Sequence, residues 1–144
     1  MKILGKFPNT RLRRVRSSDW IRRLVSENSL SSNDLILPIF IKEGKNQQEA
    51  IKTMPGVYRY TVDNINKVID KALSFQIPMV ALFPNTPTNK RDKIGSEALN
   101  ENNLVCQALR EIKKRSKNIG IMCDVALDPY TSHGHDGILR NNCI

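Results

Sequence analysis

The stretch IGIMCDVALDPYTSHGHDG, residues 119–137, decides the fold, because it joins a buried strand to a polar loop. Its first five residues are apolar and indicate a strand. The next fourteen carry three carboxylates, two histidines, a tyrosine and two glycines. Parallel α/β folds place their active sites at the carboxyl ends of such strands. The sequence therefore predicts an α/β protein with its chemistry in residues 124–137.

Two earlier apolar runs predict two more buried strands, LILPIFI at residues 35–41 and MVALF at residues 79–83. Pro38 weakens the first run as a central strand, because proline cannot donate to a sheet. Residues 42–60 are interpreted as a loop that contains Met54, Pro55 and Gly56.

A helix is predicted after each of these two strands, because apolar residues recur there at helical spacing. The first helix would begin at a cap formed by Thr61 or Asp63, and the second at a cap formed by Asn100. The apolar positions are Ile65, Val68, Ile69, Ala72 and Leu73 in the first, and Leu104, Val105, Ala108, Leu109 and Ile112 in the second. Alternating strands and helices predict a parallel sheet.

The positive charge is concentrated at the start of the chain. Residues 1–23 hold eight Lys or Arg against one aspartate, which gives +7 of the total charge of +9. A short helix predicted at residues 18–26 carries an apolar stripe that needs a surface to cover. We expect residues 1–34 to form an arm that packs on a neighbouring subunit. Nucleic acid is the alternative partner, but no recognition motif or set of stacking aromatics accompanies the basic residues.

Composition sets further expectations. No apolar run reaches the length of a membrane span, so no membrane partner is expected. The first residues lack the apolar region of a secretory signal. Three widely spaced cysteines indicate reduced thiols rather than disulfides. We expect a cytoplasmic protein.

The three carboxylates of the loop need compensation, because Asp124, Asp128 and Asp136 would repel one another if brought together. A cation, a basic partner or a raised pKa would each resolve the conflict. Carboxylate oxygens favour Mg²⁺ over Zn²⁺, whereas His133 and His135 could ligate a softer metal. The alternative is that these side chains only cap turns and satisfy the loop backbone.

The segment DVALDPYTSHGHDG resembles the active-site loop of the delta-aminolevulinate dehydratase (porphobilinogen synthase) family. Further segments resemble that family in the same order along nearly the whole chain: RRVR, LILPIFIKEG, MPGVYRY, ALFPNTP and GSEALNENNLV. The resemblance implies a (β/α)8 barrel, of which residues 35–144 would form about the first three β/α units. It also implies an octamer assembled through the arm, and the condensation of two 5-aminolevulinate molecules to porphobilinogen in heme synthesis.

The resemblance also implies roles for single residues. Asp124 would position the substrate or a Schiff-base lysine, while Asp128 and Asp136 would bind a hydrated cation or orient the substrate. Phe83 and Tyr130 would line the pocket, although Phe83 could equally be barrel core and Tyr130 could only shape the loop, as we expect of Ser132, His133 and His135.

The expected cation follows from a difference between this sequence and the zinc-dependent members of that family. Zinc-dependent members have cysteines at the positions of Ala126, Asp128 and Asp136. Zinc is therefore not expected here, and Mg²⁺ or a monovalent cation, or no active-site metal, is expected instead.

Catalytic lysines are a second departure. In the family, two lysines on later barrel strands form Schiff bases with the substrates, and these strands have no counterpart in residues 1–144. Lys113, Lys114 and Lys117 are no substitute, because they gather at a helix end where charge is solvated. We expect residues 1–144 to be inactive alone, and a non-catalytic remnant or interaction fragment remains the alternative.

Overall fold

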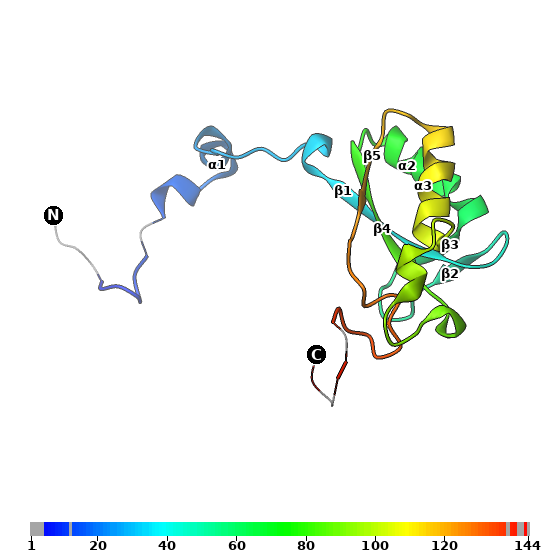
Figure 1. The fold of residues 1–144 in the computed structure, drawn as a ribbon. Helices are drawn as coiled ribbons and strands as arrows, with labels where there is room; N and C mark the ends of the chain where they lie inside the picture. Colours follow the sequence, from blue (N-terminus) through cyan, green and yellow to red (C-terminus); the bar gives the residue numbers. More distant parts are fainter. Residues whose placement is uncertain (1–4, 12, 138, 141–142, 144) are drawn as a thin grey trace. The chain divides into compact units, whose positions relative to one another are not determined.

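The computed structural model describes residues 5–11, 13–137, 139–140 and 143. The chain divides into two units, Met1–Ser31 and Ser32–Ile144, and each is described by itself (Figure 1). The first unit contains residues 1–31 of the predicted arm, and residues 32–34 belong to the second unit. The second, the sheet unit, contains all of the strands assigned to the described residues.

The arm forms two short helices, η1 Arg14–Arg16 and α1 Asp19–Leu24. The helix predicted at residues 18–26 is confirmed with shorter ends, and Asp19 pairs with Arg22 at 3.0 Å one turn later. Neither helix has a buried residue. Trp20 is 62% exposed and Leu24 is 76% exposed, so the apolar stripe is uncovered among the described residues.

The three predicted strands are confirmed as β1 Ile36–Lys42, β4 Met79–Asn85 and β5 Gly120–Cys123. β4 pairs in parallel with β1 on one side and with β5 on the other. The helices α2 Asn66–Ser74 and α3 Leu104–Arg115 connect them in the predicted alternation.

Two further strands were not predicted, and the interpretation of residues 42–60 as a loop is wrong at these points. β2 Gln48–Ala50 pairs antiparallel with β3 Tyr58–Thr61, and β3 pairs in parallel with β1, so the sheet order is β2-β3-β1-β4-β5. β2 is short and exposed along its length. Strands of three and four residues leave little periodicity, so their pairing fixes them: β3 pairs with β1, and β2 pairs with β3.

The sheet register explains why Pro38 is tolerated in a central strand. Pro38 pairs with Ala81 of β4, but β3 begins its pairing with β1 only at Phe40. Residues 36–39 therefore have a strand partner on one side only, and a proline costs least where a strand has a free side.

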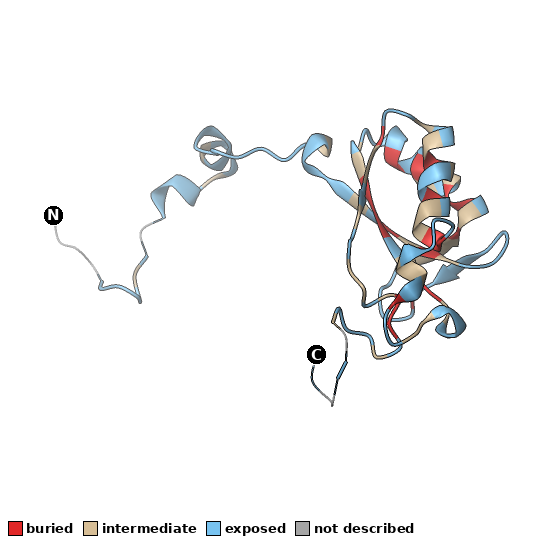
Figure 2. Cartoon of the chain, viewed as in Figure 1, coloured by how far each residue is buried: buried red, intermediate tan, exposed pale blue. Residues whose placement is uncertain are grey.

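The helices cover one face of the sheet, and the core lies between the two layers (Figures 1 and 2). Ile39 and Ile41 of β1 are fully buried there, together with Ile69 of α2. On the opposite face Phe83 is 36% exposed and Met122 is 45% exposed. The apolar run of β1 indicated a strand buried on both faces, but its buried residues, Ile39 and Ile41, both lie on the helix-facing side. In β4 the opposite face contributes one buried residue, Ala81.

The helix starts differ from their predicted caps. Asn103 caps α3, since its side chain accepts from the backbone N–H of Cys106 at 2.9 Å. Asn100 is wrong as the cap, because it accepts from Asn102 at 2.9 Å in the preceding turn. Such a cap contributes about 1 kcal/mol to helix stability.

α2 is preceded by the 3-10 turn η3 Val62–Asn64. No side chain caps the start of η3 or the start of α2. Thr61 accepts instead from Gln47 N–H at 3.0 Å, and Asp63 accepts from Asn46 N–H at 2.7 Å. The segment before β2 occupies both predicted capping side chains.

The remaining described elements are the 3-10 turns η2 Ser32–Asp34, η4 Thr88–Lys90 and η5 Ser96–Leu99. The last two lie in the long connection between β4 and α3. Among the described residues, no helix has both the length and the apolar character that a membrane span would require.

Candidate functional site

The carboxyl ends of the strands bring one row of side chains together across the open face of the sheet. Phe40 is level with Arg59 on one side and with Phe83 on the other. Leu82 pairs with Cys123, so Asp124, the next residue, continues the row beside Phe83. The rings of Phe40 and Phe83 are 5.6 Å apart and form the aromatic part of the row.

A pocket of about 350 Å³ lies over this row, and we call it the site pocket. It is lined by Phe40, Arg59, Phe83, Pro84, Asn85, Arg91, Asp124, Asp128, Pro129, Tyr130 and Gly134. Residues from five separate chain segments therefore meet at the strand ends, where the sequence predicted the chemistry.

Four of the five predicted site residues line this pocket: Phe83, Asp124, Asp128 and Tyr130. Asp124 and Asp128 are both exposed. The fifth residue, Asp136, does not line the pocket.

Asp136 instead organises the loop backbone. Its Oδ1 accepts hydrogen bonds from the N–H of Leu127 at 2.8 Å and from the N–H of Asp128 at 3.1 Å. One carboxylate oxygen thus holds two consecutive amides in place. Asp136 fixes the position of Asp128 through the backbone rather than by sharing the pocket with it.

Tyr130 is the most enclosed of the predicted residues, with 7% of its surface exposed. Burial raises the pKa of Tyr130 above its ordinary value, and nearby Cys106, Glu97 and Cys123 raise it further. The phenol therefore stays protonated at neutral pH and can donate or accept a hydrogen bond.

The two histidines of the loop lie against each other. The His133 and His135 rings are stacked with centroids 6.0 Å apart, and His133 Nε2 lies 3.4 Å from the Lys93 carbonyl oxygen. Within the described residues, no group of three His, Cys, Asp or Glu side chains converges in a way that could hold a metal ion.

Two arginines were missed by the sequence interpretation. Arg91 lines the site pocket and donates from Nε to the Thr86 carbonyl at 2.9 Å. Its loop, residues 84–97, is long enough to suggest a function, which is the feature that could have identified it. Arg59 lies on β3, which was not predicted.

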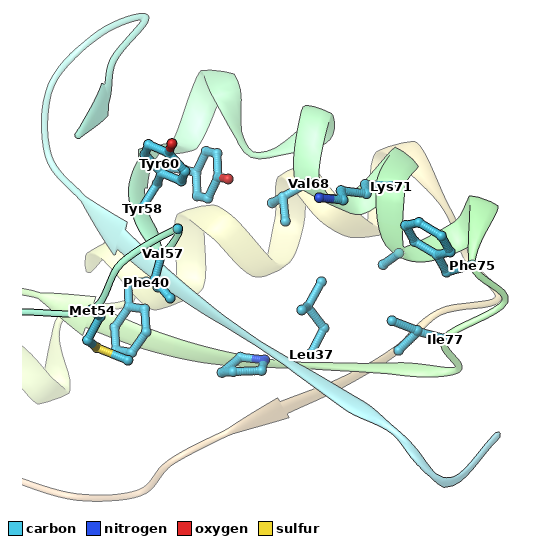
Figure 3. A pocket seen from close by; sticks show the side chains of 13 residues that line it. Leu37, Phe40, Met54, Val57, Tyr58, Tyr60, Val68, Lys71, Phe75 and Ile77 are labelled. Carbon is cyan, nitrogen blue, oxygen red and sulfur yellow. The ribbon is translucent and has the colours of Figure 1, made fainter. Parts of the chain in front are cut away.

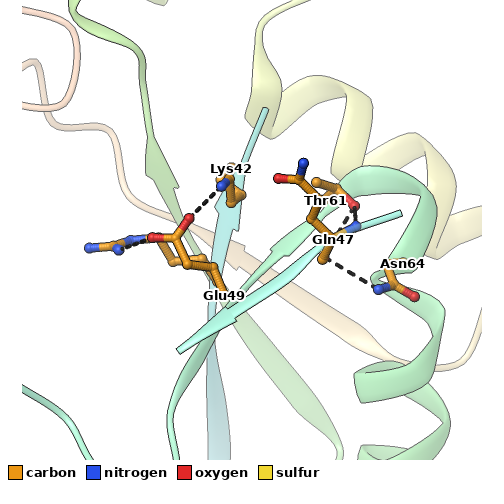
Figure 4. A network of polar contacts seen from close by, with 6 residues as sticks. Lys42, Gln47, Glu49, Thr61 and Asn64 are labelled. Atoms are coloured by element: carbon orange, nitrogen blue, oxygen red, sulfur yellow. Dashed lines mark hydrogen bonds and ion pairs between the residues drawn. The ribbon is translucent and has the colours of Figure 1, made fainter. Parts of the chain in front are cut away.

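Arg59 is held by a neighbouring carboxylate. Its guanidinium donates to Glu49 Oε1 at 2.9 Å, and Lys42 at the end of β1 also bonds to Glu49 (Figure 4). The hydrogen bonds from Lys42 and Arg59 hold the pKa of Glu49 below its ordinary value. The nearby contacts of Gln47 with Thr61 and Asn64, also drawn in Figure 4, fix the start of β2.

The site pocket therefore combines two carboxylates, Asp124 and Asp128, with two guanidinium groups, Arg59 and Arg91, around an aromatic patch. Such a pocket suits a small molecule that carries both an ammonium and a carboxylate. The carboxylates can also act as general bases or orient an amine.

A second hollow, of about 230 Å³, is different in character. It lies between β1 and α2, and Leu37, Val68, Phe75 and Ile77 are among the apolar side chains that line it (Figure 3). It flanks the part of β1 that has no β3 partner. Its lining contains no carboxylate, and its polar side chains are Tyr58, Tyr60 and Lys71.

Comparison with protein families matches residues 9–144 to the model of delta-aminolevulinic acid dehydratase. Among curated proteins, the delta-aminolevulinic acid dehydratase of Bradyrhizobium diazoefficiens is 52% identical over 134 residues, covering 93% of this chain and 38% of that protein. The enzyme of the same name from Chlamydia pneumoniae is 42% identical over 131 residues, covering 91% of this chain and 40% of that protein.

A solved structure is also similar. The delta-aminolevulinic acid dehydratase (porphobilinogen synthase) of Toxoplasma gondii, in complex with the reaction product porphobilinogen, superposes with a TM-score of 0.83 at 32% sequence identity. The match covers 92% of this chain and 37% of that one. The chain thus spans about two fifths of the length of these relatives.

Proposed function

The chain belongs to the delta-aminolevulinic acid dehydratase family, and from this premise we propose that residues 1–144 supply the amino-terminal part of a porphobilinogen synthase. The whole enzyme would condense two molecules of 5-aminolevulinate to porphobilinogen, as a lyase of heme biosynthesis. The observation that carries the proposal is the site pocket, which places Asp124 and Asp128 at the strand ends of a chain matched to this family over residues 9–144.

The sheet unit is part of a (β/α)8 barrel, as the similarity to the Toxoplasma gondii structure shows. In this architecture β1, β4 and β5 are consecutive barrel strands, and their carboxyl ends form the catalytic face. The exposed Phe83 and Met122 then face the barrel interior. The remaining barrel strands, which correspond to the part of the relatives that residues 1–144 do not cover, would close this interior.

The roles proposed for the carboxylates follow from their positions. Asp124, in the row of side chains across the sheet, would orient the substrate amine or a Schiff-base lysine. Asp128 would face the same substrate, and Asp136 would support it by holding the Asp128 amide. Phe83 and Tyr130 would enclose the substrate's apolar part.

A hydrated hard cation is the metal that these residues fit best. Mg²⁺ is commonly held by one or two carboxylates and keeps several waters, so the absence of a three-residue cluster in the described part of the chain is compatible with it. The resemblance paired Asp128 with Asp136 as ligands, but only Asp128 lines the site pocket, while Asp136 Oδ1 is engaged by the Leu127 and Asp128 amides. Asp128 would therefore hold such an ion, or a monovalent one, and the ion would stabilise negative charge beside the substrate. Zinc does not fit, since Ala126 offers no ligand and carboxylates replace thiolates.

The arm is proposed to assemble the enzyme into an oligomer, with an octamer as the expected state. The uncovered apolar stripe of α1 and the concentrated positive charge support this proposal. Cys106, Cys123 and Cys143 are free thiols, which supports the reducing cytoplasm as the compartment.

The test uses a chimera, the barrel chimera, in which residues 1–144 replace the aligned segment of the Bradyrhizobium diazoefficiens relative. We expect it to form porphobilinogen from 5-aminolevulinate, and residues 1–144 alone to form none. Asp124→Asn should lower kcat by at least ~100-fold, the usual contribution of a group that assists proton transfer.

The matched control is Glu101→Gln, which removes the same charge from an exposed residue outside the site pocket. It should leave kcat within about twofold of the unmodified chimera, because distant exposed charges are screened. A folded chimera without turnover, or equal losses in both variants, would refute the proposed function.

A further inference from the structure

Asp92 joins the loop that follows β4 to the loop that follows β5. Its backbone N–H donates to the Tyr130 carbonyl at 3.2 Å, and the Ser132 N–H donates to the Asp92 carbonyl at 2.8 Å. Asp92 and Thr131 thereby form a parallel bridge outside the main sheet. The two loops at the edge of the site pocket are held together at this residue.

The Asp92 side chain fixes the turn that makes this bridge. Its Oδ1 accepts from Ile94 N–H at 2.9 Å and from Ser96 N–H at 3.1 Å, while the Ser96 hydroxyl donates to Oδ2. Three donors on one carboxylate hold residues 92–96 in a single conformation. These hydrogen bonds keep the pKa of Asp92 below its ordinary value, and the hydrogen bond from the Ser96 side chain has the largest effect.

From the bridge, a continuous series of contacts leads to the proposed catalytic loop. Tyr130 and Thr131 donate their backbone N–H groups to the Leu127 carbonyl at 2.8 and 3.0 Å. The N–H groups of Leu127 and Asp128 then donate to Asp136. A displacement of residues 130–132 would therefore move Asp128.

We infer that Asp92 is a positioning residue, which sets the place of Asp128 in the site pocket through the backbone of residues 130–132. Asp92 itself does not line the site pocket. The inference deepens the proposed function and rests on it where activity is measured. Its structural part, the coupling of the Asp92 carboxylate to the Leu127 and Asp128 amides, can be measured without turnover.

The experiment measures kinetics and amide hydrogen exchange on the barrel chimera carrying Asp92→Ala. We expect faster exchange at Leu127 and Asp128, with the amides of β4 and β5 unchanged. We also expect kcat to fall by ~10- to 100-fold with KM within about threefold, because misplaced catalytic groups cost rate more than binding.

Asp92→Asn separates positioning from charge. The amide oxygen of asparagine can still accept from Ile94 and Ser96, so this variant should regain kcat to within about fivefold of the unmodified chimera. Ser96→Ala removes one of the three donors, the Ser96 hydroxyl, so its kcat should lie between those of Asp92→Ala and Asp92→Asn. It replaces Asp92→Ala in the test if that variant does not fold.

The matched control is Asp63→Ala, since Asp63 also accepts a backbone N–H, that of Asn46, but lies away from the site pocket. It should leave kcat and the exchange at Leu127 unchanged. Unaltered kcat in Asp92→Ala, no rescue by asparagine, or an equal loss in Asp63→Ala would overturn the inference. If the unmodified chimera has no turnover, the proposed function fails, and unchanged exchange at Leu127 in Asp92→Ala would separately refute the coupling.

Discussion

Gly95 offers the sharpest test of the loop geometry. Its φ is +69°, in the left-handed region, at the start of η5 beside the acidic loop. An alanine there would place Cβ 3.4 Å from a Leu127 methyl, 3.5 Å from a Thr131 methyl and 3.7 Å from Tyr130 Cβ. These are ordinary van der Waals distances, so Gly95→Ala introduces backbone strain but no clash.

The expected cost follows from that strain. A non-glycine residue in the left-handed region costs about 1–2 kcal/mol. The lower conformational entropy of alanine in the unfolded chain returns about 0.4–1 kcal/mol. We therefore expect Gly95→Ala to lower the free energy of unfolding of the barrel chimera by about 1 kcal/mol, measured by urea denaturation.

Gly56→Ala isolates the strain, because Gly56 has φ of +81° with no other group within 4 Å of the added Cβ. Gly56→Ala should lower the free energy of unfolding by about the same amount as Gly95→Ala. The difference between the two variants measures what the contacts of the new methyl contribute, which we expect to be below about 1 kcal/mol. A loss above ~3 kcal/mol for Gly95→Ala alone would show a clash that the geometry excludes. No loss in either variant would refute the left-handed backbone.

Three further predictions concern the cation, the arm and acid. The barrel chimera should keep its activity with a zinc-selective chelator, and activity that only zinc restores would contradict this. Changing Ala126, Asp128 and Asp136 together to cysteine should create zinc binding measurable by metal analysis, because three thiolates leave one open position. Deleting residues 1–23 should reduce the oligomer mass in light scattering without loss of the barrel's circular dichroism, and an unchanged mass would refute the role of the arm. Asp92 has a lowered pKa in the folded protein, so its contribution to stability is complete above the ordinary pKa of about 3.9 and is lost as the pH falls through the lower folded pKa. An NMR titration should show this carboxyl protonating at a lower pH than a free aspartate does. Protonation at the ordinary pKa would contradict the prediction.

The sequence by itself determined the layers of the sheet unit. The apolar runs at β1, β4 and β5 and the helical spacing of Ile65, Ile69 and Ala72 are local patterns, and they predicted the elements that pack into the core between sheet and helices. The order of these elements then required a parallel sheet. The loop from Asp124 onward could be identified for the same reason, since it follows a buried strand immediately.

Tertiary structure alone decided which side chains meet. Arg59 reaches the site pocket because β3 pairs with β1 in a register that sets Arg59 level with Phe40, and a four-residue strand carries too little pattern to predict. Asn103 rather than Asn100 caps α3, because the backbone turn before the helix had already engaged Asn100.

The same distinction separates Asp136 from Asp128. Both are aspartates of one loop, and the family resemblance implied a shared cation site for them. The folded loop instead turns Asp136 onto the amides of Leu127 and Asp128 and leaves Asp128 in the pocket. A residue's type limits the chemistry it can perform, but its partners depend on contacts between segments distant in sequence, and only the packed chain fixes those contacts.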